Sequence, residues 1–452
     1  MANPEKDDSV GFGGGAFGDE GKGKLVDAQA MQFFGEGKEV VVYRPNGGPN
    51  AGHNVEFEDK RFVFHQLPSG VFIEGATVIL GRGMVIHPAD LVEEIEQAED
   101  LIGHQLPARV LIDVKTPLAL DTHRAFEFAL KQSQEGGRGA TGRGIAPAYA
   151  DILLRQALRV EDLVDEKKLK EHYQLYQKLM AGLGLDLKEI TVPTLAGEKA
   201  AVGTEEVFVR NLISQAEKLG PYQGQVFDFL QSSWPDERKA FVFEMAQAVG
   251  LDSRFGVYPD VTASDCTFGG IFSATEGIVD PRQIKIRAGV IKATYMSSVG
   301  SRRLPTRFED QLAVRIREDA HEYGATTKRP RGIAWLDLPA LKFFARAGDF
   351  THLAVTHLDI AYPDAPILVC VEYHDKKTGQ KVGYRPYQDY LDGVDPVYKE
   401  FKPWEAQQVR QARNPEELPE EAKDYLRFLS DQLELPFYMV TTGPKREQGF
   451  FC

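Results

Sequence analysis

The apolar residues of this chain alternate between short continuous runs and segments with helical spacing. Residues 39–44 form a β-branched run typical of a buried strand. Similar runs predict strands at 62–67, 76–81, 110–113, 240–247 and 284–294, and residues 353–359 are expected to form a strand followed by a short motif. Residues 88–98 place Leu91, Val92 and Ile95 on one helical face between acidic residues, which predicts an amphipathic helix. This alternation of strands and helices indicates an α/β fold.

Four segments depart from the regular pattern. Residues 1–8 are polar and are expected to form a loose tail. Residues 10–15 would form the entry strand although only two of them are strongly apolar, and the strand at 284–294 is expected to break at Ala288-Gly289. Residues 160–235 are charged and helical in pattern, so we expect a solvated helical insertion that carries no chemistry.

Composition narrows the class of protein. The chain has 452 residues, 42% of them apolar and 27% charged, which is ordinary for a soluble globular protein with a large core. The formal net charge of -14 and the lack of a basic block argue against nucleic acid as a partner. The three cysteines are far apart, which argues against a disulfide framework or a cysteine-based metal site. With no long apolar run and no signal region, a cytoplasmic protein without a membrane partner is expected.

The most informative segment is the glycine-rich run at residues 11–23. Glycines let the backbone approach a polyphosphate closely, and a helix that follows would direct its positive end at the same anion. The run fits the G-x-x-x-x-G-K pattern of phosphate-binding loops, with Lys24 as the lysine, but Leu25 replaces the usual Ser or Thr. Because that hydroxyl normally holds Mg²⁺, another group must hold the metal, and Asp19 is the candidate.

Three further loops carry candidate chemistry. The loop at 45–54 is rich in Gly and Asn and follows a predicted strand, so its His53 is a candidate acid or base. The loop at 136–149 sets Arg and Thr on a glycine frame, which suits a phosphate monoester. The loop at 322–332 combines two threonines with two arginines, a pattern that suits a dicarboxylate.

Taken in order, these loops resemble the signatures of the adenylosuccinate synthetase family, whose members join aspartate to IMP at the expense of GTP. The resemblance covers residues 18–53, 136–159, 244–270, 322–337 and 356–446. It implies one large α/β unit across residues 1–452, related to P-loop proteins, with a central, mostly parallel sheet and helical insertions. It also implies a homodimer that uses Mg²⁺.

The resemblance assigns roles to matching positions. Asp19, Lys22 and His53 match the catalytic residues, and Asp19 with the carbonyl of Gly52 matches the Mg²⁺ ligands. The positions implied to bind IMP and aspartate are Asn50, Ala51, Thr141, Arg155, Gln247, Thr262, Thr326, Thr327 and Arg329. The positions implied to bind the nucleoside triphosphate are Gly18, Glu20, Gly21, Gly23, Lys24, Arg331, His357, Leu358, Asp359, Thr441, Thr442 and Gly443. Arg155 matches an arginine that reaches the partner subunit's phosphate site, on α-helical sequence expected to continue from 151 to 160.

The implied chemistry has a physical rationale. O6 of the IMP base is a poor leaving group, and its phosphorylation makes phosphate the leaving group. A base must first take the N1 proton, and Asp19 is placed for this step. His53 can donate to the charge that develops on the phosphoryl group. The aspartate amine, held by the 322–332 loop, then displaces phosphate at C6.

Several positions depart from the family pattern. Ala146 and Met245 replace glycines, and Lys328 replaces the glycine of the aspartate loop. Asp260 and Asp265 add negative charge beside the expected phosphate site. His357 replaces a lysine whose stem covers the guanine ring, and a histidine can stack on the base instead.

Two alternatives stay open from the sequence. The first is the aminoadenylosuccinate synthetase branch, which uses GMP or dGMP in place of IMP and often ATP in place of GTP. The loop at 45–54 looks like that branch, but those enzymes typically carry Ser where Asp19 stands. The second is a non-catalytic nucleotide-binding relative, against which the set of matching catalytic residues argues.

Overall fold

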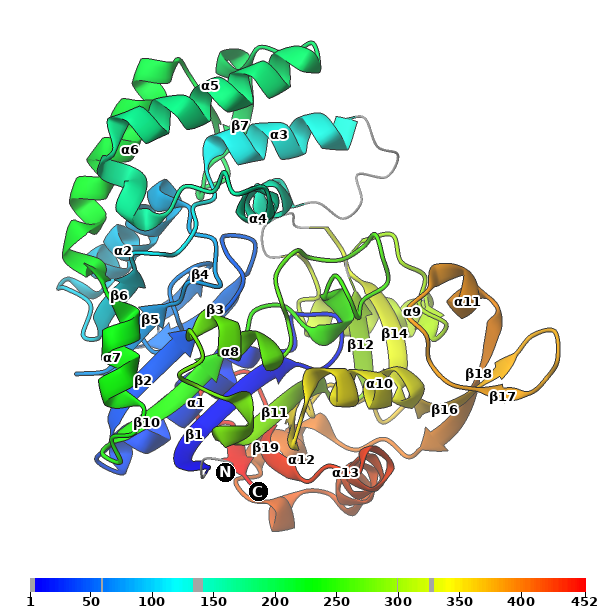
Figure 1. The fold of residues 1–452 in the computed structure, drawn as a ribbon. Coiled ribbons are helices and arrows are strands. Elements are labelled where there is room, and N and C mark those ends of the chain that lie inside the picture. The colour runs from blue at the N-terminus through cyan, green and yellow to red at the C-terminus, as the bar shows by residue number, and fades with distance from the viewer. Residues whose placement is uncertain (1–4, 58–59, 133–140, 299, 325–328) are drawn as a thin grey trace.

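A ten-stranded sheet forms the centre of the computed structural model, which describes residues 5–57, 60–132, 141–298, 300–324 and 329–452 (Figure 1). Its strand order is β20-β19-β15-β11-β1-β10-β2-β5-β6-β9. The strands are β1 (Lys6–Gly14), β2 (Glu39–Arg44), β5 (Thr77–Leu80), β6 (Arg109–Asp113), β9 (Gln223–Gly224), β10 (Lys239–Glu244), β11 (Ile284–Lys292), β15 (His352–Thr356), β19 (Phe437–Thr441) and β20 (Gly449–Phe451). Neighbours pair in parallel except β19 and β20, which are antiparallel. The expected central, mostly parallel sheet is confirmed.

The glycines of β1 explain why its apolar character is low although it lies in the middle of the sheet. Val10 faces Val242 of β10 and Ile286 of β11 in the parallel register. A Cβ at Gly11 would come within 2.4 Å of the ring of Phe268, so that ring packs directly on the strand backbone. The apolar surface that β1 lacks in its own sequence is therefore supplied by a distant segment.

Apolar cores cover both faces of the sheet, as expected for parallel strands. Alternate residues of β2 enter different cores: Val40 and Val42 belong to one, and Val41 and Tyr43 to the other. The helices are α1 (Lys22–Gly35), α2 (Pro88–Ile102), α3 (Asp121–Gln132), α4 (Ile145–Leu154), α5 (Glu166–Gly182), α6 (Glu205–Leu219), α7 (Val226–Ser233), α8 (Gly269–Ala274), α9 (Gln311–Asp319), α10 (Leu338–Gly348), α11 (Gln388–Asp392), α12 (Ala406–Gln411) and α13 (Glu420–Leu433). Helices α3 to α6 gather at one end of the molecule (Figure 1).

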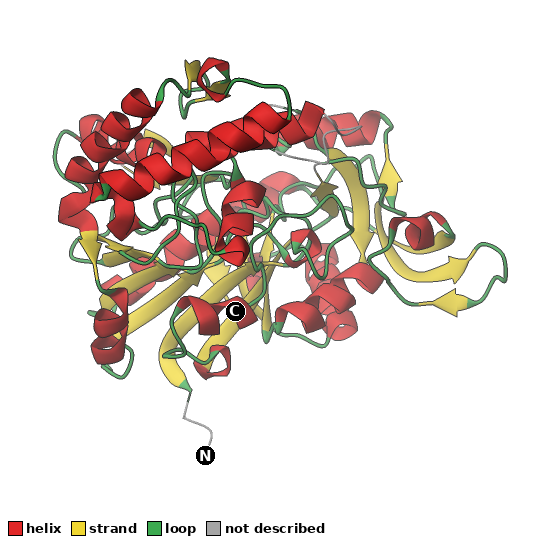
Figure 2. Ribbon diagram, turned by 45° about the horizontal axis from the view of Figure 1, so that its top comes forward, coloured by secondary structure: helices red, strands yellow, loops and turns green. Residues whose placement is uncertain are grey.

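A second, six-stranded sheet lies beside the part of the central sheet that contains β11 and β19 (Figure 1). It is made of β12 (Tyr295–Ser298), β13 (Arg307–Phe308), β14 (Gly332–Asp337), β16 (Ile367–Asp375), β17 (Lys381–Val382) and β18 (Val394–Phe401). Two hairpins complete the fold: β3 (His53–Phe57) with β4 (Lys60–Phe64), and β7 (Thr191–Pro193) with β8 (Lys199–Ala201). Figure 2 colours the helices red and the strands yellow and shows helices both above and below the central strands.

The structure corrects three boundaries. Strand β1 begins at Lys6, so residues 6–8 belong to the sheet and not to a loose tail. Strand β11 runs through Ala288-Gly289 without a break. Helix α4 ends at Leu154, where Arg155 takes a left-handed conformation with φ 60°, so the helix does not continue to residue 160.

Residues 160–235 are helical as expected, in α5, α6 and α7, but they also supply the edge strand β9 of the central sheet. None of the described helices combines the length and the apolar character needed to cross a lipid bilayer.

Candidate functional site

A cavity of about 1150 Å³ lies at the carboxyl ends of the parallel strands. Its walls include the loops that follow β1, β2, β10, β15 and β19. Ligands of open α/β sheets bind in this position because all the strands deliver their loops to the same edge. The site is therefore assembled from the amino-terminal, middle and carboxyl-terminal parts of the chain.

The cavity brings together most residues that the sequence predicts for the site. The predicted residues that line it are Gly18, Asp19, Gly21, Lys22, Gly23, Lys24, Asn50, Ala51, Gly52, His53, Thr141, Gln247, Thr262, Arg331, His357, Asp359, Thr441 and Gly443. Glu20, Leu358 and Thr442 are buried behind the wall, and Arg155 and Arg329 are exposed outside it. Thr326 and Thr327 lie outside the described residues.

The loop after β1 has a backbone that suits the predicted phosphate-binding role. Gly18, Asp19 and Gly21 all have positive φ angles, of 92°, 58° and 86°. Gly21 caps helix α1 without a side-chain hydrogen bond, an arrangement in which the first N–H groups of a helix can bind an anion. Glu20 turns inward, where its Oε1 accepts hydrogen bonds from the N–H groups of Ala16 at 3.2 Å and Gly18 at 2.7 Å. Its position indicates that Glu20 shapes the loop from behind.

Asp19 and Arg331 form an ion pair that joins the phosphate loop to the second sheet. Nη1 of Arg331 also lies 2.9 Å from Oε2 of Glu322. Glu322 is 1% exposed, and burial alone would raise the pKa of its carboxyl. The charges of Lys292 and Arg331 outweigh that effect and hold the pKa well below its usual range. A negative charge is therefore fixed behind Arg331.

His53 begins β3 with its ring held beside an acidic residue. Its Nε2 lies 3.6 Å from Oε1 of Glu244, at the carboxyl end of β10, and has no hydrogen-bond partner although it is buried. Burial lowers the pKa of His53 to about 4, so the imidazole is neutral at pH 7. Glu244 is anchored by Ser69, whose N–H and hydroxyl donate to its two oxygens at 2.8 Å each.

Polar side chains tie the remaining loops of the cavity together. Nε2 of Gln247 donates to Oδ1 of Asn50 at 3.2 Å, and Oε1 of Gln247 accepts from the hydroxyl of Ser264 at 2.9 Å. The two acidic departures do not leave bare charge at this wall. Asp260 accepts hydrogen bonds from the N–H and hydroxyl of Ser301 at 3.1 and 2.7 Å, and Asp265 pairs with Arg254.

The opposite end of the cavity is built from the loops after β15 and β19. Oδ2 of Asp359 lies 2.8 Å from Nε of Arg410, and Nδ1 of His357 lies 2.9 Å from the hydroxyl of Tyr295. Burial lowers the pKa of His357. Nζ of Lys24 donates to the carbonyls of Gly443 and Gln448 and so fastens the phosphate loop to the carboxyl-terminal turn.

The oxygen donors beside the phosphate loop fit Mg²⁺. Asp19 offers a carboxylate and Gly52 a carbonyl, both at the cavity wall, and Mg²⁺ prefers such oxygen ligands together with substrate phosphates.

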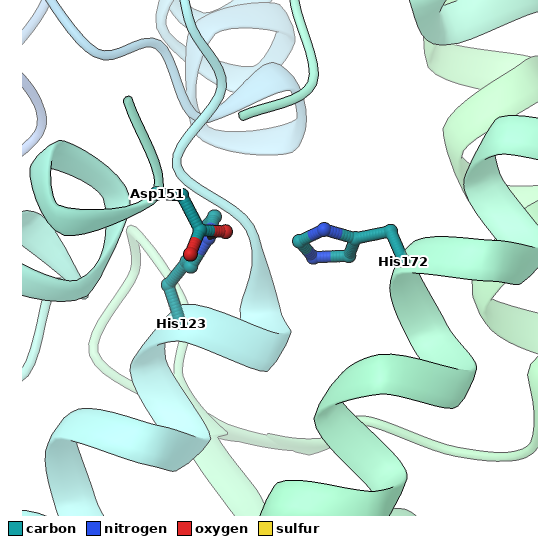
Figure 3. A group of neighbouring side chains, drawn as sticks. All are labelled: His123, Asp151 and His172. Carbon is teal, nitrogen blue, oxygen red and sulfur yellow. Dashed lines mark hydrogen bonds and ion pairs between the residues drawn. The ribbon is translucent and has the colours of Figure 1, made fainter. Parts of the chain in front are cut away.

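A separate group of possible metal ligands, His123, Asp151 and His172, lies away from the cavity (Figure 3). Nδ1 of His123 accepts from the N–H of Leu120 at 2.9 Å, and its Nε2 lies 3.0 Å from Oδ2 of Asp151. Nε2 of His172 contacts the hydroxyl of Thr122 at 2.9 Å. Imidazole nitrogens do not suit Mg²⁺, and these bonds already occupy both nitrogens of His123. The group acts as a polar contact that joins α3, α4 and α5.

The sequence did not single out five charged residues at or behind the cavity wall: Arg44, Glu244, Lys292, Arg302 and Glu322. Four of them line the cavity, and Lys292 lies behind it against Glu322. The signal that could have found Arg44, Glu244 and Lys292 is a single charge at the end of a buried apolar strand, because that is where parallel strands deliver functional side chains.

Comparisons with known proteins agree along the chain. A family model described as adenylosuccinate synthetase matches residues 13–450. The adenylosuccinate synthetase of Leuconostoc mesenteroides is 35% identical over 96% of both chains, and that of Clostridium botulinum strain Alaska E43 is 36% identical over 96% of this chain and 97% of its own. The fully ligated adenylosuccinate synthetase from Plasmodium falciparum superposes with a TM-score of 0.86 at 29% identity, over 98% of this chain and 100% of that one. A cyanophage S-2L succinoaminodeoxyadenylate synthetase bound to dGMP and dATP shares the fold, with a TM-score of 0.58 at 17% identity over 98% of this chain and 94% of that one.

Proposed function

Because the chain belongs to the adenylosuccinate synthetase family, we infer that it is a ligase that joins L-aspartate to IMP with GTP and releases adenylosuccinate, GDP and phosphate. The observation that supports this assignment is the cavity at the strand ends, which gathers the predicted site residues. It holds the phosphate loop, Asp19 and His53 at one wall and Asp359 at another, so a triphosphate and a monophosphate nucleotide can meet there.

We propose that Asp19 takes the N1 proton of IMP and so makes O6 nucleophilic. In this structure its carboxylate is paired with Arg331. The pair must open as the substrate enters, and Arg331 can then stay on Glu322, which already binds its other nitrogen at 2.9 Å. The buried carboxylate of Glu322 thus leaves Asp19 available without leaving a buried guanidinium unpaired.

His53 is proposed as the hydrogen-bond donor to the phosphoryl group in transfer. Its ring is neutral, and Glu244 stands 3.6 Å from Nε2 to stabilise positive charge that develops on the imidazole. Lys22, the first residue of α1, lines the cavity and is proposed to neutralise phosphate charge. Mg²⁺, held by Asp19 and the Gly52 carbonyl together with phosphate oxygens, would supply further neutralisation of that charge.

The second half of the reaction replaces phosphate by aspartate at C6. The amine forms the C–N bond as the C6–O6 bond breaks, so phosphate leaves with the electron pair and the amine loses a proton. We propose that Thr326, Thr327 and Arg329 bind the dicarboxylate. Arg329 is exposed and directly follows the undescribed residues 325–328, so it lies on the same loop.

We propose that the phosphate of IMP binds between Thr141 and Thr262, with Asn50, Ala51 and Gln247 along the nucleoside. All five line the cavity, and the hydrogen bond between Gln247 and Asn50 aligns two of the loops. Asp265 is paired with Arg254 and the carboxylate of Asp260 is bound by Ser301, so neither carboxylate is left unpartnered beside the proposed phosphate position.

A homodimer is proposed from the surface at the end of α4. Leu153 is 85% and Leu154 64% exposed, and the exposed Arg155 follows directly. Two neighbouring leucines on an exposed helix end are typical of a surface covered by another chain. In a two-fold dimer Arg155 would reach the phosphate site of the partner.

The test is a substrate matrix. The protein is incubated with Mg²⁺ and aspartate, with each of IMP, GMP and dGMP and each of GTP and ATP, and phosphate release is followed. We expect phosphate to be released with IMP and GTP, and only when aspartate is present. Turnover with GMP or dGMP but not IMP would replace this function by that of the aminoadenylosuccinate synthetase branch. Nucleotide binding without phosphate release would indicate a non-catalytic relative.

A further inference from the structure

One buried carboxylate connects the two ends of the cavity. Oε1 of Glu322 accepts hydrogen bonds from Nζ of Lys292 and from the hydroxyl of Tyr295, the latter at 2.6 Å. Oε2 accepts a hydrogen bond from Nη1 of Arg331 at 2.9 Å. Tyr295 in turn contacts Nδ1 of His357 at 2.9 Å. Tyr295 is 0% and Lys292 3% exposed, so these bonds are made in a dry environment where an unmatched donor or acceptor is costly.

The order of donors and acceptors along this chain of bonds fixes the tautomer of His357. Two cations neutralise Glu322, which is therefore ionised and can only accept hydrogen bonds. The Tyr295 hydroxyl has one proton, which it must donate to Glu322. Its oxygen therefore accepts the hydrogen bond from His357. Nδ1 of His357 must then carry the proton, and Nε2 carries a lone pair.

We infer that His357 is a specificity-determining residue whose Nε2 accepts a hydrogen bond from an exocyclic amino group of the purine triphosphate, with Tyr295 and Glu322 as the residues that position it. His357 and Asp359 both line the cavity, and they are separated by one residue. The inference rests on the proposed function in one respect, the placement of the triphosphate base beside Asp359. The 2-amino group of guanine and the 6-amino group of adenine are both donors of the required kind, whereas the hypoxanthine base of ITP has no exocyclic amino group.

The first experiment measures the tautomer in the ligand-free protein. The histidines are labelled with ¹⁵N, and the resonances of His357 are assigned by their loss in His357→Phe. We expect Nδ1 protonated and Nε2 unprotonated at pH 7 in the wild type, with this preference reduced in Tyr295→Phe. Tyr373→Phe is the matched control, because Tyr373 also donates to a buried carboxylate, that of Asp337, at a distance from the cavity. A proton on Nε2 in the wild type would overturn the inference, whatever substrates the enzyme uses.

The second experiment compares the KM values of triphosphates that carry different purine bases. His357→Phe should raise the KM for GTP roughly tenfold, the usual effect of losing one hydrogen bond, and leave the values for IMP, aspartate and ITP unchanged. His357→Gln, whose carbonyl oxygen can take the place of Nε2, should recover most of the loss. A rise confined to ATP would assign the acceptor to a 6-amino group. An equal rise for ITP and GTP would show that the ring acts by shape alone and would overturn the inference. Asp359→Asn, measured alongside, tests the placement of the base independently.

Discussion

Replacement of Asp19 by asparagine removes the carboxylate that is proposed both as the base and as a Mg²⁺ ligand. The amide has the shape of the carboxylate but cannot take the N1 proton, and general-base catalysis contributes roughly 10²–10⁴-fold to a rate. That range corresponds to about 2.7–5.4 kcal/mol of transition-state stabilisation. The fold should tolerate the change, because Arg331 keeps its bond to Glu322 at 2.9 Å and no guanidinium is left unpaired. We therefore expect a large loss of kcat with little change in the unfolding temperature.

The assay is aspartate-dependent phosphate release with IMP and GTP, together with thermal unfolding of the same samples. Asp265→Asn is the matched control, since Asp265 also pairs with an arginine, Arg254, but does not line the cavity. It should keep near wild-type kcat. Retention of more than about a tenth of the wild-type kcat by Asp19→Asn would refute the assignment of the base. A matching loss in Asp265→Asn would show that the assay reports loop stability and not chemistry.

Four further changes test other parts of the site. His53→Asn should lower kcat by roughly 10²–10⁴-fold, and a change confined to KM would instead mark His53 as a binding residue. Arg155→Leu should weaken IMP binding. Mixing this variant with Asp19→Ala should restore some activity, because one site of a mixed dimer then has both wild-type side chains. No recovery of activity after confirmed subunit exchange would count against a shared site. Asp359→Asn should reduce the use of GTP sharply, because a carboxylate pairs with both N1–H and the 2-amino group of guanine; equal or better use of ATP by the wild type would contradict that reading. Burial holds the pKa of His172 well below 6.5, so the unfolded chain takes up a proton at a higher pH than the folded protein does. The free energy of unfolding should therefore fall as the pH drops below about 6.5, by up to about 1.4 kcal/mol per pH unit. His172→Gln should lower the pH dependence of the unfolding temperature between pH 7 and 5, and an unchanged dependence would contradict this.

The sequence predicted the parts of the fold whose cause is local. The valines of β2 and the helical spacing of α2 lie in the residues that form those elements, and both predictions are confirmed. The full length of β1 could not be predicted, because its glycines are packed by Phe268 from a distant segment. The break expected at Ala288-Gly289 is absent because flanking strands hold both residues in register.

The same distinction applies to the site. Loops with their own glycine patterns, such as the phosphate loop, could be recognised along the chain. The contacts of Asp19 with Arg331, and of Glu322 with both Arg331 and Tyr295, join residues whose neighbours in sequence give no sign of the pairing. Such long-range ion pairs depend on the register of the sheet and on the placement of the second sheet. The exposure of the leucines at the end of α4 likewise could be seen only in the folded structure.

The fastening of the phosphate loop to the carboxyl-terminal turn has a consequence for how the enzyme is made. Lys24 is translated long before its partners, the carbonyls of Gly443 and Gln448, which follow it by 419 and 424 residues. Central strand β1 must also wait for β10 and β11. A nascent chain therefore carries the glycine-rich loop long before residues 443–448 can hold it, so we expect competence to bind nucleotide only after those residues have been made. The high sequence separation of these contacts also predicts slow folding.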